Sequence, residues 1–237
     1  MVIICKCSKI VQKSTIGDGS VLYCFSVKRY KTEPSPFVSL QAMDIEKHPF
    51  EPFLPENARI LFLGSFPPQP HRWCMPFYYP NWINVFWRII GLIHFNDRDH
   101  FCIISEKRFD ESAIRTFCTE KGLAFYDTAT EIRRLKDNAS DAFLEVVTPT
   151  DIQALLQKIP HCNTLVTTGQ KATEVIANTF NCPIPPIGAS IGLNIETGHT
   201  QDGSPIIRQI TFYRMPSTSR AYPLSIEKKA AAYRIIF

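Results

Sequence analysis

The chain has 237 residues, of which 45% are hydrophobic and 20% are charged, and its formal net charge is +4. This composition is typical of a soluble globular protein, and no apolar run reaches the length of a membrane span, which argues against a membrane protein. The eight cysteines form no CxxC pair, and no signal peptide is recognisable, so we expect reduced thiols in a cytoplasmic protein without a metal site. The small positive charge permits an anionic partner without requiring one.

Residues 1–45 differ from the rest of the chain. Short β-like runs at 2–4 and 21–27 flank a turn at 17–20 that is rich in glycine. We therefore predict a small strand-bearing N-terminal extension over 1–45, of unknown role, followed by one main domain over 46–237.

In the main domain, strand and helix signals alternate. Apolar runs predict strands at 59–63, 123–126, 164–168 and 206–213. Apolar spacing and capping residues predict helices at about 84–94, 110–122, 151–158, 170–179 and 224–236. This alternation predicts an α/β fold, namely a three-layer α/β/α sandwich around a short, mainly parallel four-stranded sheet.

Three loops follow predicted strands, at 64–84, 127–136 and 214–222. In a parallel sheet such loops meet at the carboxyl ends of the strands, where ligands bind. The first loop opens the stretch GSFPPQPHRWCMPFYYPNWINVFW, which has eight aromatic residues. Its Tyr78 and Tyr79 could present flat faces to a base, although aromatic loop residues more often belong to the core.

The other two loops carry polar groups. Asp127 follows a buried strand and either accepts hydrogen bonds from a ligand or caps a helix that begins near Thr128. The last loop either caps a helix or offers hydroxyl and guanidinium donors to phosphate oxygens. Its candidate phosphate ligands are Ser217, Thr218, Ser219 and Arg220. Together the three loops describe a site for an extrahelical nucleotide.

The ordered motifs resemble those of the uracil-DNA glycosylase superfamily. Gly64-Ser-Phe-Pro-Pro68, Phe77-Tyr-Tyr-Pro-Asn81 and Asn84-Val-Phe-Trp87 resemble its first motif, and Met215-Pro-Ser-Thr-Ser219 resembles its second. With Asp127 at a strand end, the set is most similar to the hypoxanthine-DNA glycosylase branch. The resemblance covers the chain from about His48 to Phe237, and the extension lies outside it.

This resemblance implies a monofunctional DNA glycosylase that acts as a monomer without metal or cofactor. Its substrate would be DNA with a deaminated base, hypoxanthine or uracil, which is flipped out and removed to leave an abasic site. The resemblance makes Asn84 the catalytic residue, through a water molecule that its amide orients. The backbone amides of Ser65 and Phe66 would face the base carbonyl, Tyr79 or Tyr78 would stack on the ring, and Asp127 would read an N–H edge.

Two positions depart from the superfamily pattern. Phe66 stands where better-known branches have a water-binding Asp or Asn, and Met215 stands where they have His or Asn. Catalysis is therefore either weak or carried by other residues. A protein that binds a damaged base or a nucleotide without cutting is the alternative function. Asn84 could also serve only as a helix cap, in which case Asn81 is the nearest substitute.

Overall fold

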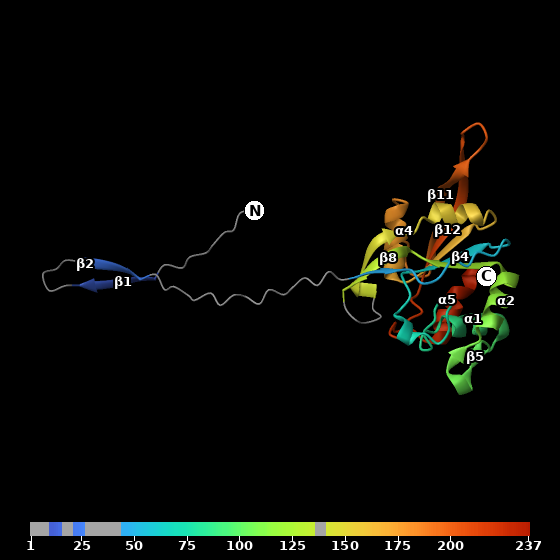
Figure 1. Cartoon of the computed structure of the whole chain (residues 1–237), viewed down its shortest axis with the longest axis horizontal. Helices are drawn as coiled ribbons and strands as arrows, with labels where there is room; N and C mark the ends of the chain where they lie inside the picture. Colours follow the sequence, from blue (N-terminus) through green and yellow to red (C-terminus); the bar gives the residue numbers. More distant parts are fainter. Residues whose placement is uncertain (1–9, 16–20, 27–43, 136–140) are drawn as a thin grey trace. The chain divides into compact units, whose positions relative to one another are not determined.

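The computed structural model describes residues 10–15, 21–26, 44–135 and 141–237. The chain forms two compact units, Met1–Gln41 and Ala42–Phe237. In the first unit, β1 (Ile10–Thr15) and β2 (Val21–Ser26) form an antiparallel pair (Figure 1). The expected run at 2–4 and turn at 17–20 lie outside the described residues.

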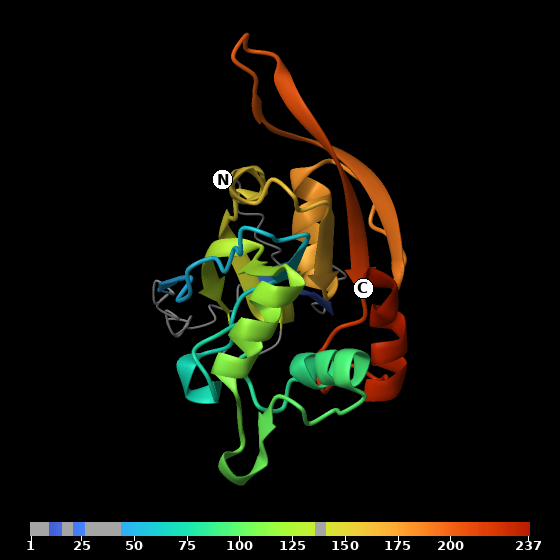
Figure 2. The same ribbon diagram turned by 90° about the vertical axis from the view of Figure 1, so that its right-hand side faces the viewer.

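The second unit is built on a five-stranded sheet with the order β11-β12-β10-β4-β7. Its parallel strands are β4 (Ile60–Gly64), β7 (Leu123–Asp127), β10 (Thr164–Thr168) and β12 (Pro205–Met215). The four-strand prediction missed an antiparallel edge strand, β11 (Ala189–His199), which pairs with β12. Figure 2 shows this pair continuing past the other strands as a hairpin.

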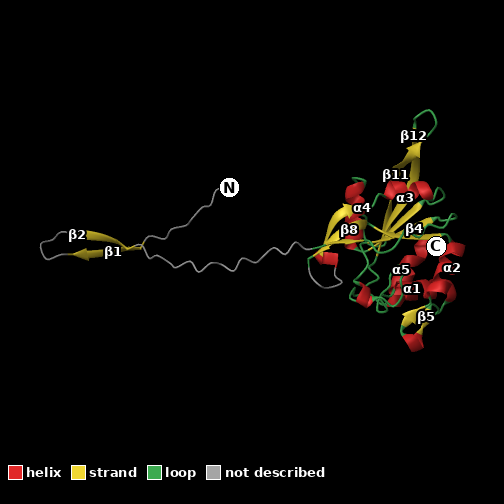
Figure 3. Ribbon diagram, viewed as in Figure 1, coloured by secondary structure: helices red, strands yellow, loops and turns green. Residues whose placement is uncertain are grey.

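Helices cover both faces of the sheet. Figure 3 shows one group, α1, α2 and α5, on one side of the strands and the other group, α3 and α4, on the opposite side. The helices are α1 (Phe86–Phe95), α2 (Glu111–Lys121), α3 (Ile152–Lys158), α4 (Gln170–Thr179) and α5 (Ile226–Tyr233). Two of the predicted helix starts are capped as expected, because the carboxylates of Asp110 and Asp151 accept from the amides of Ala113 and Ala154. The three-layer arrangement of the prediction is therefore present.

A second, three-stranded sheet was not predicted. It consists of β3 (Ile45–Lys47), β8 (Ala129–Arg134) and β9 (Leu144–Pro149), all antiparallel. It replaces the helix that we expected near Thr128, because the chain after Asp127 continues in an extended conformation and pairs with β3 and β9. Smaller elements are β5 (Cys102–Ile103), β6 (Arg108–Phe109) and 3-10 helices at Pro70–Arg72, Ile104–Glu106, Asp141–Phe143 and Arg234–Ile236.

The core of the second unit is rich in aromatic rings. Phe62, Phe86, Trp87 and Phe125 are fully buried, and Phe62 stacks on Phe125 with ring centroids 5.3 Å apart. Each buried ring of this size contributes a large apolar area to the stability of the core. Among the described residues, no helix has both the length and the apolar character needed to cross a membrane.

Candidate functional site

The strand order reverses between β4 and β10, because the chain passes from β4 to β7 on one side and then to β10 on the other. In α/β sheets such a switch point is where ligands bind. A cleft of about 880 Å³ lies at the carboxyl ends of these strands. All ten residues that the sequence analysis selected line it, namely Ser65, Phe66, Tyr78, Tyr79, Asn84, Asp127, Ser217, Thr218, Ser219 and Arg220. Thr168, the last residue of β10, and the next two residues form a further wall that was not predicted.

The floor of the cleft is a close contact between Gly64 and Asp127, the last residues of neighbouring strands. The two residues are directly paired in the sheet. A Cβ atom at position 64 would come within 2.4 Å of Asp127 Oδ1, so only glycine leaves room for the carboxylate. Beyond this glycine, the backbone amides of Ser65 and Phe66 make no hydrogen bond with any described residue. They are therefore available as donors to a ligand.

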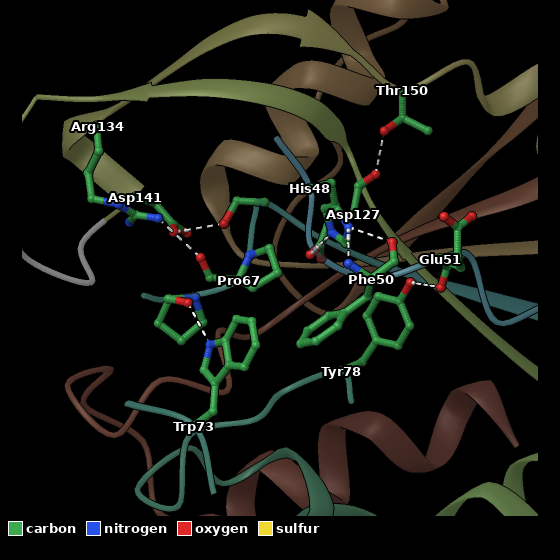
Figure 4. Close-up of polar contacts among 12 residues, drawn as sticks. His48, Phe50, Glu51, Pro67, Trp73, Tyr78, Asp127, Arg134, Asp141 and Thr150 are labelled. Atoms are coloured by element: carbon green, nitrogen blue, oxygen red, sulfur yellow. Dashed lines mark hydrogen bonds and ion pairs between the residues drawn. The ribbon is translucent and has the colours of Figure 1, made fainter. Parts of the chain in front are cut away.

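Asp127 is oriented by His48, whose role was not predicted from the sequence. His48 Nε2 lies 2.9 Å from Asp127 Oδ2, and the histidine side chain is 2% exposed (Figure 4). His48 Nδ1 lies 2.8 Å from the carbonyl oxygen and 3.2 Å from the amide nitrogen of Phe50. Since Nε2–H donates to Oδ2, Oδ1 of Asp127 is the oxygen left to accept from a ligand.

The two tyrosines that were candidates for stacking have different environments. Tyr78 is 3% exposed, and its hydroxyl donates to the carbonyl of Glu51, so its ring belongs to the core. Tyr79 is partly exposed and stacks one face on Phe86, with ring centroids 3.9 Å apart. Its hydroxyl lies 2.8 Å from the Thr168 hydroxyl. Tyr79 is therefore the more accessible of the two tyrosines that line the cleft.

Asn84 lies just before α1 and lines the cleft. Its Oδ1 accepts a hydrogen bond of 2.9 Å from the amide of Phe86, at the start of α1. The N-cap residue of α1 is Val85, which makes no side-chain cap, so Asn84 lies one residue before the cap position and holds only the Phe86 amide. Its Nδ2 has no hydrogen-bond partner among the described residues, so the amide keeps two donors for a ligand or water. Asn81, the substitute, accepts from the amide of Ile83 in the same way.

Helix α5 contacts the hydroxyl-rich loop at 217–220 through Lys229. Lys229 is 1% exposed, and its Nζ donates to the carbonyl of Ser219 at 2.8 Å. Burial lowers the pKa of Lys229. The carbonyl of Thr218 accepts from the amide of Val85 at 3.1 Å, which joins this loop to the residue after Asn84. Thr218 is only 2% exposed, whereas Ser217 and Ser219 keep more of their surface exposed.

A second carboxylate lines the cleft and was also missed. Asp141 begins a 3-10 helix between β8 and β9, and its Oδ1 accepts a hydrogen bond of 2.7 Å from Ser65 Oγ (Figure 4). Burial raises the pKa of Asp141, and the nearby Asp127 acts in the same direction. Nothing in the local sequence distinguishes this aspartate, because it reaches the cleft only through the unpredicted second sheet.

Among the described residues, arginines outnumber carboxylates in the lining of the cleft, but two of these arginines already bind other protein groups. Arg134 forms a two-pronged ion pair with Glu46, and the Arg214 guanidinium donates to the Pro185 carbonyl and the Gln170 side chain. Arg220 is exposed at the rim, and Arg72 is partly exposed there. Among the described residues, no group of three or more His, Cys, Asp and Glu side chains is arranged to hold a metal ion.

Comparisons with known proteins bear on the fold. No family model and no curated protein matches the sequence. Thirteen chains of solved structure are similar to it. One is the solution NMR structure of a "putative Uracil DNA glycosylase" from Methanosarcina acetivorans, with a TM-score of 0.50 and 18% sequence identity over 81% of this chain and 99% of that chain. The chain has a uracil-DNA glycosylase-like fold.

In this glycosylase-like fold, the two positions that depart from the superfamily motifs are packed. The Phe66 and His48 rings form a T-shaped contact, with centroids 5.2 Å apart, and Phe66 packs on a small cluster around Ile132. Met215, the last residue of β12, is 1% exposed. Neither side chain can bind a proton or hold a water molecule by a strong hydrogen bond.

Proposed function

We propose that the chain is a monofunctional DNA glycosylase. It hydrolyses the N-glycosidic bond of a deaminated base, hypoxanthine or uracil, that is flipped out of DNA, and it leaves an abasic site. The observation that carries this proposal is the cleft at the sheet's switch point, which brings together free backbone amides, a partly exposed tyrosine, a buried carboxylate and a hydroxyl-rich loop. The glycosylase-like fold supports the same reaction class.

Base recognition uses groups of opposite hydrogen-bonding character. Asp127 Oδ1 accepts from the N–H edge that hypoxanthine and uracil both present, and a carboxylate rejects bases that show only an acceptor there. The amides of Ser65 and Phe66 donate to the base carbonyl. Negative charge develops on this carbonyl as the bond breaks, so fixed donors stabilise the transition state more than the ground state. Tyr79 stacks on the ring, an interaction of roughly 1–3 kcal/mol.

Contacts to the DNA backbone come from the loop after β12. Hydroxyl O–H groups of Ser217 and Ser219 and the exposed guanidinium of Arg220 donate to phosphate oxygens. Thr218 contributes its backbone rather than its hydroxyl, because it is buried. These contacts hold one strand in register with the cleft and carry no sequence information.

Asn84 is proposed to orient the attacking water through its Nδ2 donors. The test uses two variants that differ in the hydrogen bond to the Phe86 amide. Asn84→Asp keeps an oxygen that accepts from the Phe86 amide but loses the amide donors, whereas Asn84→Ala loses both. If Asn84 orients water, both variants lose excision. If it only holds this amide, Asn84→Asp excises at the wild-type rate.

The function itself is tested on oligonucleotides that each carry one hypoxanthine, uracil or xanthine. Purified protein in molar excess is incubated with each duplex and each single strand, and alkali then converts abasic sites to breaks. We expect breaks at hypoxanthine or uracil and none in the undamaged control. Intact strands for every lesion contradict the proposal.

A second function is favoured by the apolar side chains of Phe66 and Met215 in the two departing positions. The protein would then flip and hold a damaged base without cutting. Lesion-selective binding in a gel-shift assay, without any abasic product from the same DNA, identifies this function. A steep fall in affinity with added salt separates both DNA functions from binding of free nucleotides.

A further inference from the structure

Two carboxylates line the cleft in the described part of the chain, and their surroundings differ. Asp127 has Oδ2 paired with His48 and Oδ1 against the backbone of Gly64, at the floor. Asp141 has Oδ1 bound by Ser65 Oγ–H, while its Oδ2 has no hydrogen-bond partner among the described residues. One carboxylate is therefore held for recognition, and the other keeps an oxygen for a further contact.

The second oxygen of Asp141 lies at the switch point itself. It would be 3.7 Å from a Cβ atom at position 169, but that residue is a glycine. Gly169 has φ +143°, a conformation that side-chain-bearing residues rarely adopt, and it precedes α4. The missing side chain leaves Oδ2 uncovered on the side of β10, while Ser65 holds Oδ1 on the side of β4.

The surroundings of Asp141 favour proton acceptance, chiefly because the carboxyl group is buried. Burial is the largest effect on its pKa and raises it, and Asp127 adds to the increase. The Ser65 hydrogen bond and the positive charges of Lys171 and Arg134 act in the opposite direction. A carboxylate with a pKa closer to neutrality is a more effective general base than one at its usual value, provided that it is still ionised.

On the basis of the proposed function, we propose that Asp141 is the catalytic carboxylate that activates water, in place of the position occupied by Phe66. The geometry that carries this is the Ser65 contact, the uncovered Oδ2 and the location in the cleft. As the bond between C1′ and the base nitrogen breaks, its electron pair leaves with the base. The water oxygen then bonds to C1′ and its proton passes to Asp141. The Asp141 carboxylate also stabilises the positive charge on the sugar.

Asp141→Asn is the decisive variant, because asparagine still accepts from Ser65 but cannot take a proton. We expect single-turnover excision, with enzyme in excess, to fall at least about 100-fold. Affinity for a duplex whose lesion carries a non-cleavable 2′-fluoro sugar should stay within about three-fold of wild type, since the same hydrogen bond positions the side chain. The matched control is Asp202→Asn, which removes the same charge in an exposed turn between β11 and β12. It should excise like the wild type.

The pH profile separates a general base from a structural residue. In the wild type, the excision rate should rise with pH as Asp141 ionises and then level off, and Asp141→Asn should lose this rise. Excision by Asp141→Asn at the wild-type rate, or an equal loss of excision and binding, overturns the assignment while the glycosylase proposal stands. If the wild type cuts no lesion in the same assay, the glycosylase proposal itself fails and this assignment fails with it.

Discussion

His48 and Asp127 are 79 residues apart in the sequence and form a buried hydrogen bond of 2.9 Å at the floor of the cleft. The histidine comes from the first residues of the main domain, and the aspartate is the last residue of β7. The pair therefore ties the start of the domain to the cleft. It also determines which oxygen of Asp127 faces a ligand.

His48→Phe removes this hydrogen bond and keeps a ring of similar shape among Phe66, Tyr126 and the other neighbouring rings. We expect the free energy of unfolding to fall by about 2 kcal/mol, because a buried carboxylate oxygen loses its donor. Urea denaturation measures this loss. In an Asp127→Asn background the same change should cost less, and equal losses in the two backgrounds would mean that the pair is not coupled.

Gly64→Ala would place a methyl group against Asp127 Oδ1, at 2.4 Å in the present geometry. We expect a loss of about 1–3 kcal/mol of stability from this overpacking, together with weaker lesion binding as the carboxylate moves. Gly192→Ala is the control, because a Cβ atom there meets nothing within 4 Å. Thermal unfolding of both variants checks the prediction, and similar melting temperatures would contradict it.

Tyr79 offers a pair of variants that separate its ring from its hydroxyl. Tyr79→Phe loses the contact with the Thr168 hydroxyl but keeps the stack on Phe86, so we expect a stability loss of about 1 kcal/mol and unchanged lesion affinity. Tyr79→Leu also loses the ring and should bind lesion DNA about 10- to 100-fold more weakly. Fluorescence anisotropy with a non-cleavable lesion measures both affinities. Equal affinities would show that Tyr79 does not stack on the base.

Arg220→Ala should weaken binding to all DNA sequences alike. If the exposed guanidinium binds one phosphate, the slope of log affinity against log salt concentration should decrease in magnitude by about one. Lys158→Ala removes an exposed positive charge at the end of α3, shortly before β10 begins. This charge therefore lies near the amino-terminal ends of the parallel strands, away from the cleft at their carboxyl ends. That variant should keep the wild-type slope. A matching decrease in both variants would mean that only net charge matters.

The sequence predicted the elements whose signals are local. The strand at 164–168 has the predicted bounds, and the helix after Asp110 has the predicted cap. Strand β11 was missed even though alternate residues such as Leu193 and Ile195 are buried, because the glycines and polar residues between them weakened its pattern. The strand after Asp127 was missed because Thr128 was interpreted as the start of a helix. Its pairing with β3 and β9 depends on residues far away in the sequence.

The residues of the candidate site also fall into two groups, those that local motifs predict and those that depend on distant contacts. Residues in short motifs, such as Ser65, Asn84 and the loop at 217–220, could be selected from the sequence because motif order is a local property. His48 and Asp141 could not, since the hydrogen bond that connects each of them to a motif residue or to Asp127 joins segments more than 70 residues apart. The two groups that complement the motif residues are therefore visible only in the folded chain.

The raised pKa of Asp141 also leads to a prediction about stability, which does not depend on any reaction. Its pKa is raised in the folded protein, so folding is favoured when it is protonated and disfavoured when it is ionised. The stability that this group contributes is full below the pKa of the unfolded chain, about 4 for an aspartate, and is lost as pH rises through the higher folded pKa. Asp141→Asn removes the buried charge and keeps the Ser65 contact. We therefore expect the variant to be more stable than the wild type at pH 7, and the difference to vanish near pH 3.

Urea denaturation of both proteins across this pH range, with Asp202→Asn as the control, checks the sign. The exposed carboxyl of Asp202 has a lowered pKa, because the Thr200 hydroxyl and the Ser204 amide donate to it, so its replacement should be neutral or destabilising at pH 7. A less stable Asp141→Asn at pH 7 would mean that the charge of Asp141 is compensated in the folded state. A gain in stability with a loss of excision is the combination expected of a residue kept for chemistry at the expense of the fold.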